Sequence, residues 1–351
     1  MRSGRLVVNS HQAVMADAAD RGIEYPAHGM HTLPLRWSRR RWLFVPAAAA
    51  MHVLAASSLS AQPAAPRVDA TALSARVDDL LREHGQGIEA GLWLGGAAGA
   101  AAFERDATTP RATASAIKTF YLVELFGRFA GALDRPLPGV DVVLADDAHP
   151  AIGHFTPEQR AEIRGALNGA TVRRVALAMM GTAPASNIVY NAAANVVTAV
   201  LGGPDALTAL IRQRDPAFAV SVRRYMLRDR HEHGDNEAPP IALAALYQRL
   251  AAGRLAGVDA TTMDAIREAL RRADDPVLGR HYDKNGDLDT DPLAMVRAGW
   301  YDTAGGPLVY VVMTTQPTPG PSGREASSEQ LAKTADALAH TIVQAGRAAL
   351  P

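Results

Sequence analysis

The sequence contains no cysteine among its 351 residues. Without thiols the chain cannot build a disulfide framework, a thiolate metal site or a cysteine nucleophile. Lysine is scarce as well, because only three of the 36 basic residues are lysine, at positions 118, 284 and 333. An amine can lose its proton at workable pH whereas a guanidinium cannot. Each lysine is therefore a candidate for proton transfer or for binding an anion.

The chain also lacks net charge, with 36 basic and 36 acidic residues. Binding to phosphate backbones requires a basic surface, so we expect no nucleic-acid partner. Apolar residues make up 48% of the chain, which supports a packed core rather than disorder. The length fits one large domain or two small ones.

The first 61 residues have the layout of a secretory signal peptide, with a start at Met30 and cleavage after Ala61. Residues 36–41 are basic and residues 43–59 are apolar and alanine-rich. The arginine run also resembles a twin-arginine signal. The alternative is a membrane anchor, but about 17 apolar residues is at the short edge for a span. We expect export by the Sec or twin-arginine route to the periplasm or medium, and no stable membrane span after cleavage.

The remaining residues, 62–351, change pattern twice. Strand-like segments lie near both ends, at residues 87–103, 294–301 and 307–315. Helical periodicity covers residues 70–84, 115–130, 157–180, 186–201, 205–212, 240–255, 261–272 and 329–350. The economical fold class is α/β (α+β), with one antiparallel sheet built from both ends, flanked by helices, and an inserted all-α domain. We place the α/β part at residues 62–114 and 276–351 and the all-α part at residues 115–275.

The first candidate motif is Ser115-Ala116-Ile117-Lys118, at the start of an apolar helix. Residues three apart share a helix face, so Lys118 can reach the hydroxyl of Ser115. The helix N-terminus favours negative charge on that oxygen, and burial of the amine lowers its pKa so that it can accept the proton. The alternative is a capping serine followed by an exposed lysine, but the helix is mostly apolar around Lys118.

A second candidate motif opens the next long helix, where Ser186 and Asn187 form a polar pair. The pair can place a hydroxyl or an amide beside a site, or it can simply cap the helix.

The third motif is the polar run 283–287, which includes Lys284, Asn285 and Gly286. An ammonium and an amide at the rim of a sheet would suit an anionic substrate. Its alternating Asp and Asn residues also allow a calcium loop, but the sixth and twelfth positions are Leu288 and Ala294 instead of glycine and glutamate. A plain polar turn is the third reading. His231 and His233 are two apart, which suits no zinc spacing, so we expect no metal and no cofactor.

Taken in order, the three motifs resemble the S-x-x-K, S-D-N and K-T-G pattern of the class A β-lactamase family and its serine-hydrolase relatives. The similarity covers nearly all of residues 70–348. It includes residues 113–118, 171–180, 185–191, 201–204, 236–246 and 297–309.

The resemblance implies a role for each residue of the motifs. Ser115 would be the acylated nucleophile and Lys118 its base. Asn187 would hold Lys118 and a substrate carbonyl, and Lys284 would meet a substrate carboxylate beside Asn285. The oxyanion hole would consist of the backbone N–H groups of Ser115 and of Asp287, the residue after Gly286.

The sequence departs from the family pattern at three places. The family's S-D-N serine aligns with Ala185, so its hydroxyl is missing unless Ser186 substitutes. The K-T-G motif has become Lys-Asn-Gly. The family's deacylating glutamate has no clear match in the stretch 221–229, and spacing favours none of the possible substitutes, Asp229, Glu232 and Glu237.

We therefore predict a monomeric serine hydrolase that forms an acyl-enzyme on a small molecule, with β-lactams as the favoured class. The alternatives are a penicillin-binding, transpeptidase-like or esterase-like enzyme, and a protein that binds β-lactams without turnover. Acylation is better supported by the sequence than rapid hydrolysis.

Overall fold

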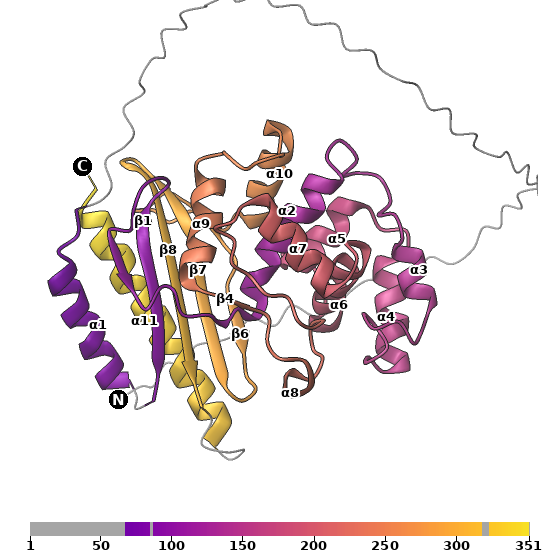
Figure 1. The fold of residues 1–351 in the computed structure, drawn as a ribbon, viewed down its shortest axis with the longest axis horizontal. Coiled ribbons are helices and arrows are strands. Elements are labelled where there is room, and N and C mark those ends of the chain that lie inside the picture. Colours follow the sequence, from indigo (N-terminus) through magenta and orange to yellow (C-terminus); the bar gives the residue numbers. More distant parts are fainter. Residues whose placement is uncertain (1–66, 85–86, 318–322, 351) are drawn as a thin grey trace, which may run out of the picture. The chain divides into compact units, whose positions relative to one another are not determined.

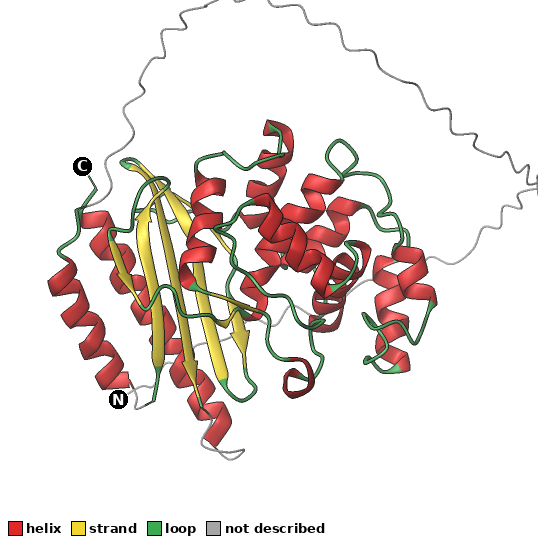
Figure 2. Cartoon of the chain, in the orientation of Figure 1, coloured by secondary structure: helices red, strands yellow, loops and turns green. Residues whose placement is uncertain are grey.

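The computed structural model describes residues 67–84, 87–317 and 323–350. The predicted signal segment lies outside the described residues. Figure 1 shows a sheet with helices on both faces and a helical region to one side of it, and Figure 2 separates the two by colour. The predicted fold class, an antiparallel sheet flanked by helices with a large helical insertion, is confirmed.

The main sheet has six strands in the order β2-β1-β8-β7-β5, and β6 also pairs with β7. All of these pairings are antiparallel. Strands from the two ends of the chain meet where β1 pairs with β8 along its whole length. The strands are β1 (Glu89–Gly96), β2 (Phe103–Arg105), β5 (Arg280–Asp283), β6 (Gly286–Leu288), β7 (Leu293–Thr303) and β8 (Gly306–Gln316).

The central strands are apolar on both faces because both faces are covered. On one face, Leu92, Leu94 and Tyr310 pack in a core beneath α1 (Ala70–His84) and α11 (Arg324–Ala348). On the other face, Trp93 and Val311 join the large core that continues into the helical part. Alternate residues of one strand thus feed two different cores.

The helical part is organised around α2 (Lys118–Arg128), in which residues 118–126 are all buried. A helix buried on every side must be apolar nearly all round, and Lys118 is an exception within it. The helices around α2 are α5 (Val172–Met180), α6 (Asn187–Val200), α7 (Pro204–Arg214) and α10 (Ala260–Leu270). The others are α3 (Val140–Ala145), α4 (Pro157–Leu167), α8 (Arg230–His233) and α9 (Pro240–Ala251).

The structure differs from the sequence expectation in several local features. The helix expected from residue 115 begins as a 3-10 turn, η1 (Ala114–Ile117), before α2. The expected all-α part contains β4 (Glu237–Ala238), which pairs with β3 (Arg111–Ala112). Helix α9 packs against the sheet. Strands of two to four residues have too few positions to show a period, so only tertiary pairing reveals them.

Among the described residues, no single helix is long and apolar enough to cross a bilayer. Helices α6 and α7 meet the length and hydropathy requirement only when taken together, and that pair is bent by 76°.

Candidate active site

Ser115 lies in a cleft of about 850 Å³ between the sheet and the helical part. The turn that carries it is fixed by Thr113, whose backbone N–H and hydroxyl both donate to the carbonyl of Asn236, at 2.9 and 2.8 Å. Ala114, just before the serine, has a positive φ of 46°. The serine is half-buried and lines the cleft, so its hydroxyl is accessible at a rigidly held position.

Strand β6 approaches the turn so closely that it requires a glycine. A Cβ atom at Gly286 would lie 2.6 Å from the backbone nitrogen of Ser115 and 2.8 Å from that of Ala116. Any larger residue would push the strand away from Ser115. This contact places β6, which begins at Gly286 and continues with Asp287, against the backbone of the turn that carries Ser115.

Lys118 is completely buried, and its amine is held by oxygen acceptors and a ring. Its Nζ donates to the amide oxygen of Asn191 at 3.0 Å and to the carbonyl of Tyr190 at 3.5 Å, and it lies 3.1 Å from the centre of the Tyr190 ring. Burial lowers the pKa of Lys118 well below its usual value, and the charge of Lys284 lowers it further. A lowered pKa makes the amine lose its proton more readily, which is the property that a lysine base needs.

The amide that binds Lys118 is a correction to the sequence expectation. Asn187 was expected to hold Lys118, but the partner is Asn191, one turn later on α6. Asn191 in turn donates its Nδ2 to the backbone and side-chain oxygens of Asn187, both at 3.0 Å. Asn187 therefore orients the amide that orients the lysine. Both asparagines line the cleft.

Ser186 caps helix α6 and is absent from the cleft lining. Its hydroxyl accepts from the backbone N–H of Val189 at 3.2 Å and donates to the carboxylate of Glu162. This is the capping alternative considered for the motif. The structure does not bring the hydroxyl to the cleft as a substitute for the missing serine at Ala185.

Lys284, from the turn between β5 and β6, brings a second amine to the cleft. Its residue is 7% exposed, its Nζ donates to the carbonyl of Asn285 at 3.1 Å, and it lies 5.1 Å from the centre of the Tyr190 ring. The ring of Tyr190 thus lies close to the amines of both Lys118 and Lys284, within the range over which an aromatic ring attracts a positive charge.

Asp283 fixes the turn that carries Lys284. Its carboxylate accepts from Arg272 Nε at 2.7 Å and from Asn285 Nδ2 at 2.9 Å. The side-chain oxygen of Asn285 accepts from the backbone N–H of Ala298 at 3.3 Å. Asp287 pairs with Arg297. With both Asp283 and Asp287 bound to arginines, the calcium-loop alternative gains no support, and the described residues contain no cluster suited to a metal.

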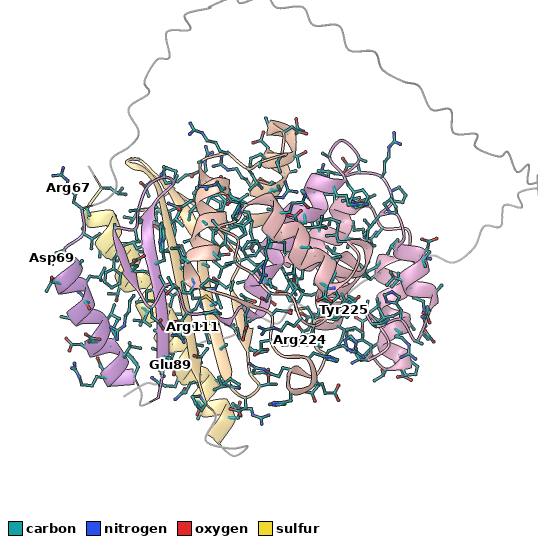
Figure 3. All side chains as sticks on the ribbon, in the orientation of Figure 1. Arg67, Asp69, Glu89, Arg111, Arg224 and Tyr225 are labelled. Atoms are coloured by element: carbon teal, nitrogen blue, oxygen red, sulfur yellow. The ribbon has the colours of Figure 1, made fainter. Side chains whose placement is uncertain are left out.

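The opposite side of the cleft comes from residues 221–236, here called the loop wall. Asn236 binds the backbone N–H groups of Arg223 and Arg224, at 2.8 and 3.1 Å. Asn195 of α6 binds both the N–H and the carbonyl of Met226. Arg224, labelled in Figure 3, comes from this segment and shares the carboxylate of Asp235 with Arg230. These buried bonds anchor the loop wall to the helical part.

Of the three carboxylates that could substitute for the deacylating glutamate, two lie outside the cleft lining and the third caps a helix. Glu237 does not line it and pairs with Arg223. Glu232 does not line it and is exposed on α8 beside His233. Asp229 does line it, but its carboxylate caps α8 by accepting from the backbone N–H of His231 at 2.7 Å.

Sequence reasoning missed Asn191, Asn195 and the arginines of the loop wall. One signal was present, because Asn187, Asn191 and Asn195 are spaced by four and therefore share one face of α6. The arginines gave no such signal, since arginine is the usual basic residue throughout this chain.

Solved structures with the same fold include several serine enzymes. One is the class A beta-lactamase of the last common ancestor of Gram-negative bacteria, with 18% identity over 79% of this chain and 99% of that chain and a TM-score of 0.55. Another is a class A beta-lactamase from Mycobacterium abscessus, with 17% identity, coverage of 79% and 100%, and a TM-score of 0.55. A PBP-A variant in acyl-enzyme complex with penicillin G has 20% identity, coverage of 80% and 99%, and a TM-score of 0.55.

The family follows from comparison of the sequence itself. Curated protein sequences provide no match. A family model described as the beta-lactamase enzyme family matches residues 72–345, which is more than half of the chain. The chain therefore belongs to the beta-lactamase enzyme family and is a serine hydrolase of the β-lactamase type.

Proposed function

We propose that this serine hydrolase forms its acyl-enzyme at Ser115, with Lys118 as the base, and that release of the acyl group limits its turnover. The observation that carries the first part is the buried amine of Lys118, with its lowered pKa, on the residue three positions after a serine in the cleft. The second part is supported by the loop wall, which offers no free buried carboxylate among its described residues.

The proposed acylation needs one proton transfer and one bond exchange. Lys118 Nζ takes the proton of the Ser115 hydroxyl as the serine oxygen attacks the lactam carbonyl carbon. The new C–O bond forms, the lactam C–N bond breaks, and the proton passes to the leaving nitrogen. The N–H groups of Ser115 and Asp287 stabilise the oxyanion, while Lys284 binds the carboxylate of the substrate.

Hydrolysis of the ester then requires a water molecule activated by a base. In the cleft, Asp229 is engaged in capping α8 and Asp287 pairs with Arg297. Asp235 is bound by two arginines. Asp289 is exposed to solvent. General-base assistance is typically worth about 10²–10⁴-fold, so its loss would leave the acyl-enzyme long-lived.

Intact-protein mass spectrometry after mixing residues 62–351 with benzylpenicillin tests both parts. We expect a one-to-one adduct that persists for many minutes, and a nitrocefin trace with a burst of one equivalent before a slow phase. Ser115→Ala should give no adduct. Labelling that persists in Ser115→Ala would overturn the nucleophile, and an adduct that clears within seconds would overturn slow deacylation.

We also propose that residues 1–61 direct export and are removed, so that a monomer acts in the periplasm or medium on a small molecule, without nucleic acid, and confers some protection against β-lactams. The basic and apolar segments at residues 36–41 and 43–59 support export. Cell fractionation with N-terminal sequencing of the exported protein tests it, and a mature form that keeps residues 43–59 would contradict cleavage.

A further inference from the structure

The loop wall contributes three arginines to the lining of the cleft. Arg224, Arg228 and Arg230 all line the cleft together with Ser115. These arginines differ in whether a carboxylate of the protein already binds the guanidinium.

Arg224 and Arg230 are committed to the loop wall itself. Both are buried, at 9% and 8% exposure, and both bind Asp235. Arg230 also donates to the carbonyls of Thr290 and Pro292, at 2.8 and 2.7 Å. Two guanidinium groups share one carboxylate, so this trio keeps one excess positive charge. In addition, the buried Nε of Arg224 has no hydrogen-bond acceptor among the described residues.

Arg228 differs from these two because its guanidinium is not committed. The residue is half-buried and lines the cleft, and none of the hydrogen bonds or ion pairs found among the described residues involves its side chain. Its backbone is nevertheless fixed, since its carbonyl accepts from Arg224 Nη1 at 2.9 Å. The carboxylate of the adjacent Asp229 accepts from the backbone N–H of His231, and no ion pair between it and Arg228 is found among the described residues.

The cleft therefore holds two separate positive positions that the protein leaves open to a ligand, Lys284 on the β5–β6 turn and Arg228 on the loop wall. A guanidinium binds a carboxylate with two parallel hydrogen bonds, and such charge-assisted pairs are stronger than neutral ones. The trio of Arg224, Arg230 and Asp235 beside it adds one positive charge, and the other carboxylates that line the cleft are those of Asp229, Asp287 and Asp289.

We infer that Arg228 forms a second carboxylate subsite, which selects acyl donors that carry an acidic group on the acyl side chain in addition to the carboxylate met by Lys284. This inference rests on the proposed acylation of Ser115. It names the substrate class as dianionic amides or lactams, with one acid on each side of the bond that breaks.

Carbenicillin and benzylpenicillin provide a matched test, because carbenicillin is benzylpenicillin with one added carboxylate on the side chain. The second-order rate constant for acylation would be measured for each by mass spectrometry. We expect the carbenicillin-to-benzylpenicillin ratio to exceed one in the natural sequence and to fall about tenfold in Arg228→Gln. It should also fall with added salt in the natural sequence, because salt screens exposed charges.

Two further variants sharpen the test. Arg254→Gln removes an exposed arginine that does not line the cleft, and it should keep the ratio of the natural sequence. Arg228→Lys keeps the charge but loses the two-pronged geometry, so its ratio should be intermediate. Because both substrates report on the same folded fraction, partial unfolding of a variant cancels from the ratio.

The outcomes separate the inference from the proposal beneath it. A ratio at or below one, or an equal ratio in Arg228→Gln and the natural sequence, overturns the second subsite while acylation stands. Absence of any adduct with either penicillin overturns the acylation of Ser115 instead.

Discussion

The two sides of the cleft differ in how many charged side chains they contain and in how exposed those side chains are. On the side of Ser115, the amine of Lys118 is fully buried and held by the neutral side chain of Asn191. On the loop wall, Arg224 and Arg230 share the carboxylate of Asp235, and Arg228 and Asp229 retain contact with solvent. Burial on the first side disfavours a charged amine, whereas the second side keeps charged groups exposed to solvent.

The difference follows from the chemistry that each side can perform. A lysine becomes a base only when burial lowers its pKa, and a carboxylate partner would reverse that effect. No residue of the loop wall is proposed to act as a base, so its charged side chains can bind a substrate or stabilise the loop. Under the proposed function, acylation and substrate recognition therefore depend on different elements of the cleft.

Replacing Lys118 with arginine should have the largest effect. A guanidinium stays protonated and cannot accept the serine proton, so acylation should fall by about 10²–10⁴-fold. In the natural protein the acylation rate should fall as the pH drops through the lowered pKa of Lys118, because the amine then becomes protonated. Stopped-flow measurements with nitrocefin between pH 5 and 9 would check both, and retained acylation in Lys118→Arg would contradict a lysine base.

On the other side of the cleft, Asp235→Asn should loosen the loop wall. It removes the carboxylate shared by two buried arginines, and breaking a buried ion pair in this way typically costs about 3–5 kcal/mol. Hydrogen exchange should show faster exchange in residues 221–236, while protection in α2 changes less. Equal exchange in the two proteins would mean that Asn195 and Asn236 suffice to hold the segment.

Asn191→Ala separates the two asparagines of α6. It removes the hydrogen bond to Lys118 Nζ, and the loss of one such bond, about 1–1.5 kcal/mol, corresponds to roughly a tenfold slower acylation. Asn187→Ala should slow acylation less than Asn191→Ala does, because Asn187 acts on Lys118 only through Asn191. A greater loss in Asn187→Ala would instead favour direct contact between Asn187 and the substrate.

Lys118→Met should raise thermal stability while it abolishes activity. The pKa of Lys118 is lowered in the folded protein, so below the ordinary lysine pKa of about 10.4 the unfolded chain binds a proton that the folded chain does not. The stability of the natural protein therefore falls as the pH drops from that value toward the lowered pKa. The melting-temperature advantage of Lys118→Met should grow from pH 10 to pH 7, and an advantage that shrinks would contradict a neutral buried amine.

Ser186→Ala should have the smallest effect. Loss of the N-cap of α6 typically costs about 1 kcal/mol, which a urea titration would measure. Because the hydroxyl faces Val189 N–H and Glu162, acylation should change by less than about twofold. A loss of acylation of tenfold or more would restore Ser186 as a proton relay.

Much of the architecture could be predicted from residue periodicity, and the exceptions have a common cause. The long helices and the strands β1, β7 and β8 have enough residues to show a helical or strand pattern. Strands β3 and β4 have two residues each, and β6 has three. Their pairing depends on partners far along the chain, as for Arg111 with Ala238. The site followed the same division, since the serine and lysine shared one local motif whereas the loop wall had none.

The local pattern was enough to select Ser115 and Lys118 as the candidate pair, because residues three apart at a helix start share one face whatever the rest of the chain does. The tertiary structure was needed to show that Asn191 rather than Asn187 binds the amine and that Ser186 lies outside the cleft lining. It was also needed to show that the Arg228 side chain has no hydrogen-bond or ion-pair partner within residues 67–84, 87–317 and 323–350. Those outcomes depend on packing between distant segments, and Lys118 and Asn191 are 73 residues apart. The direction of each side chain there is set by its neighbours and not by its position in a motif.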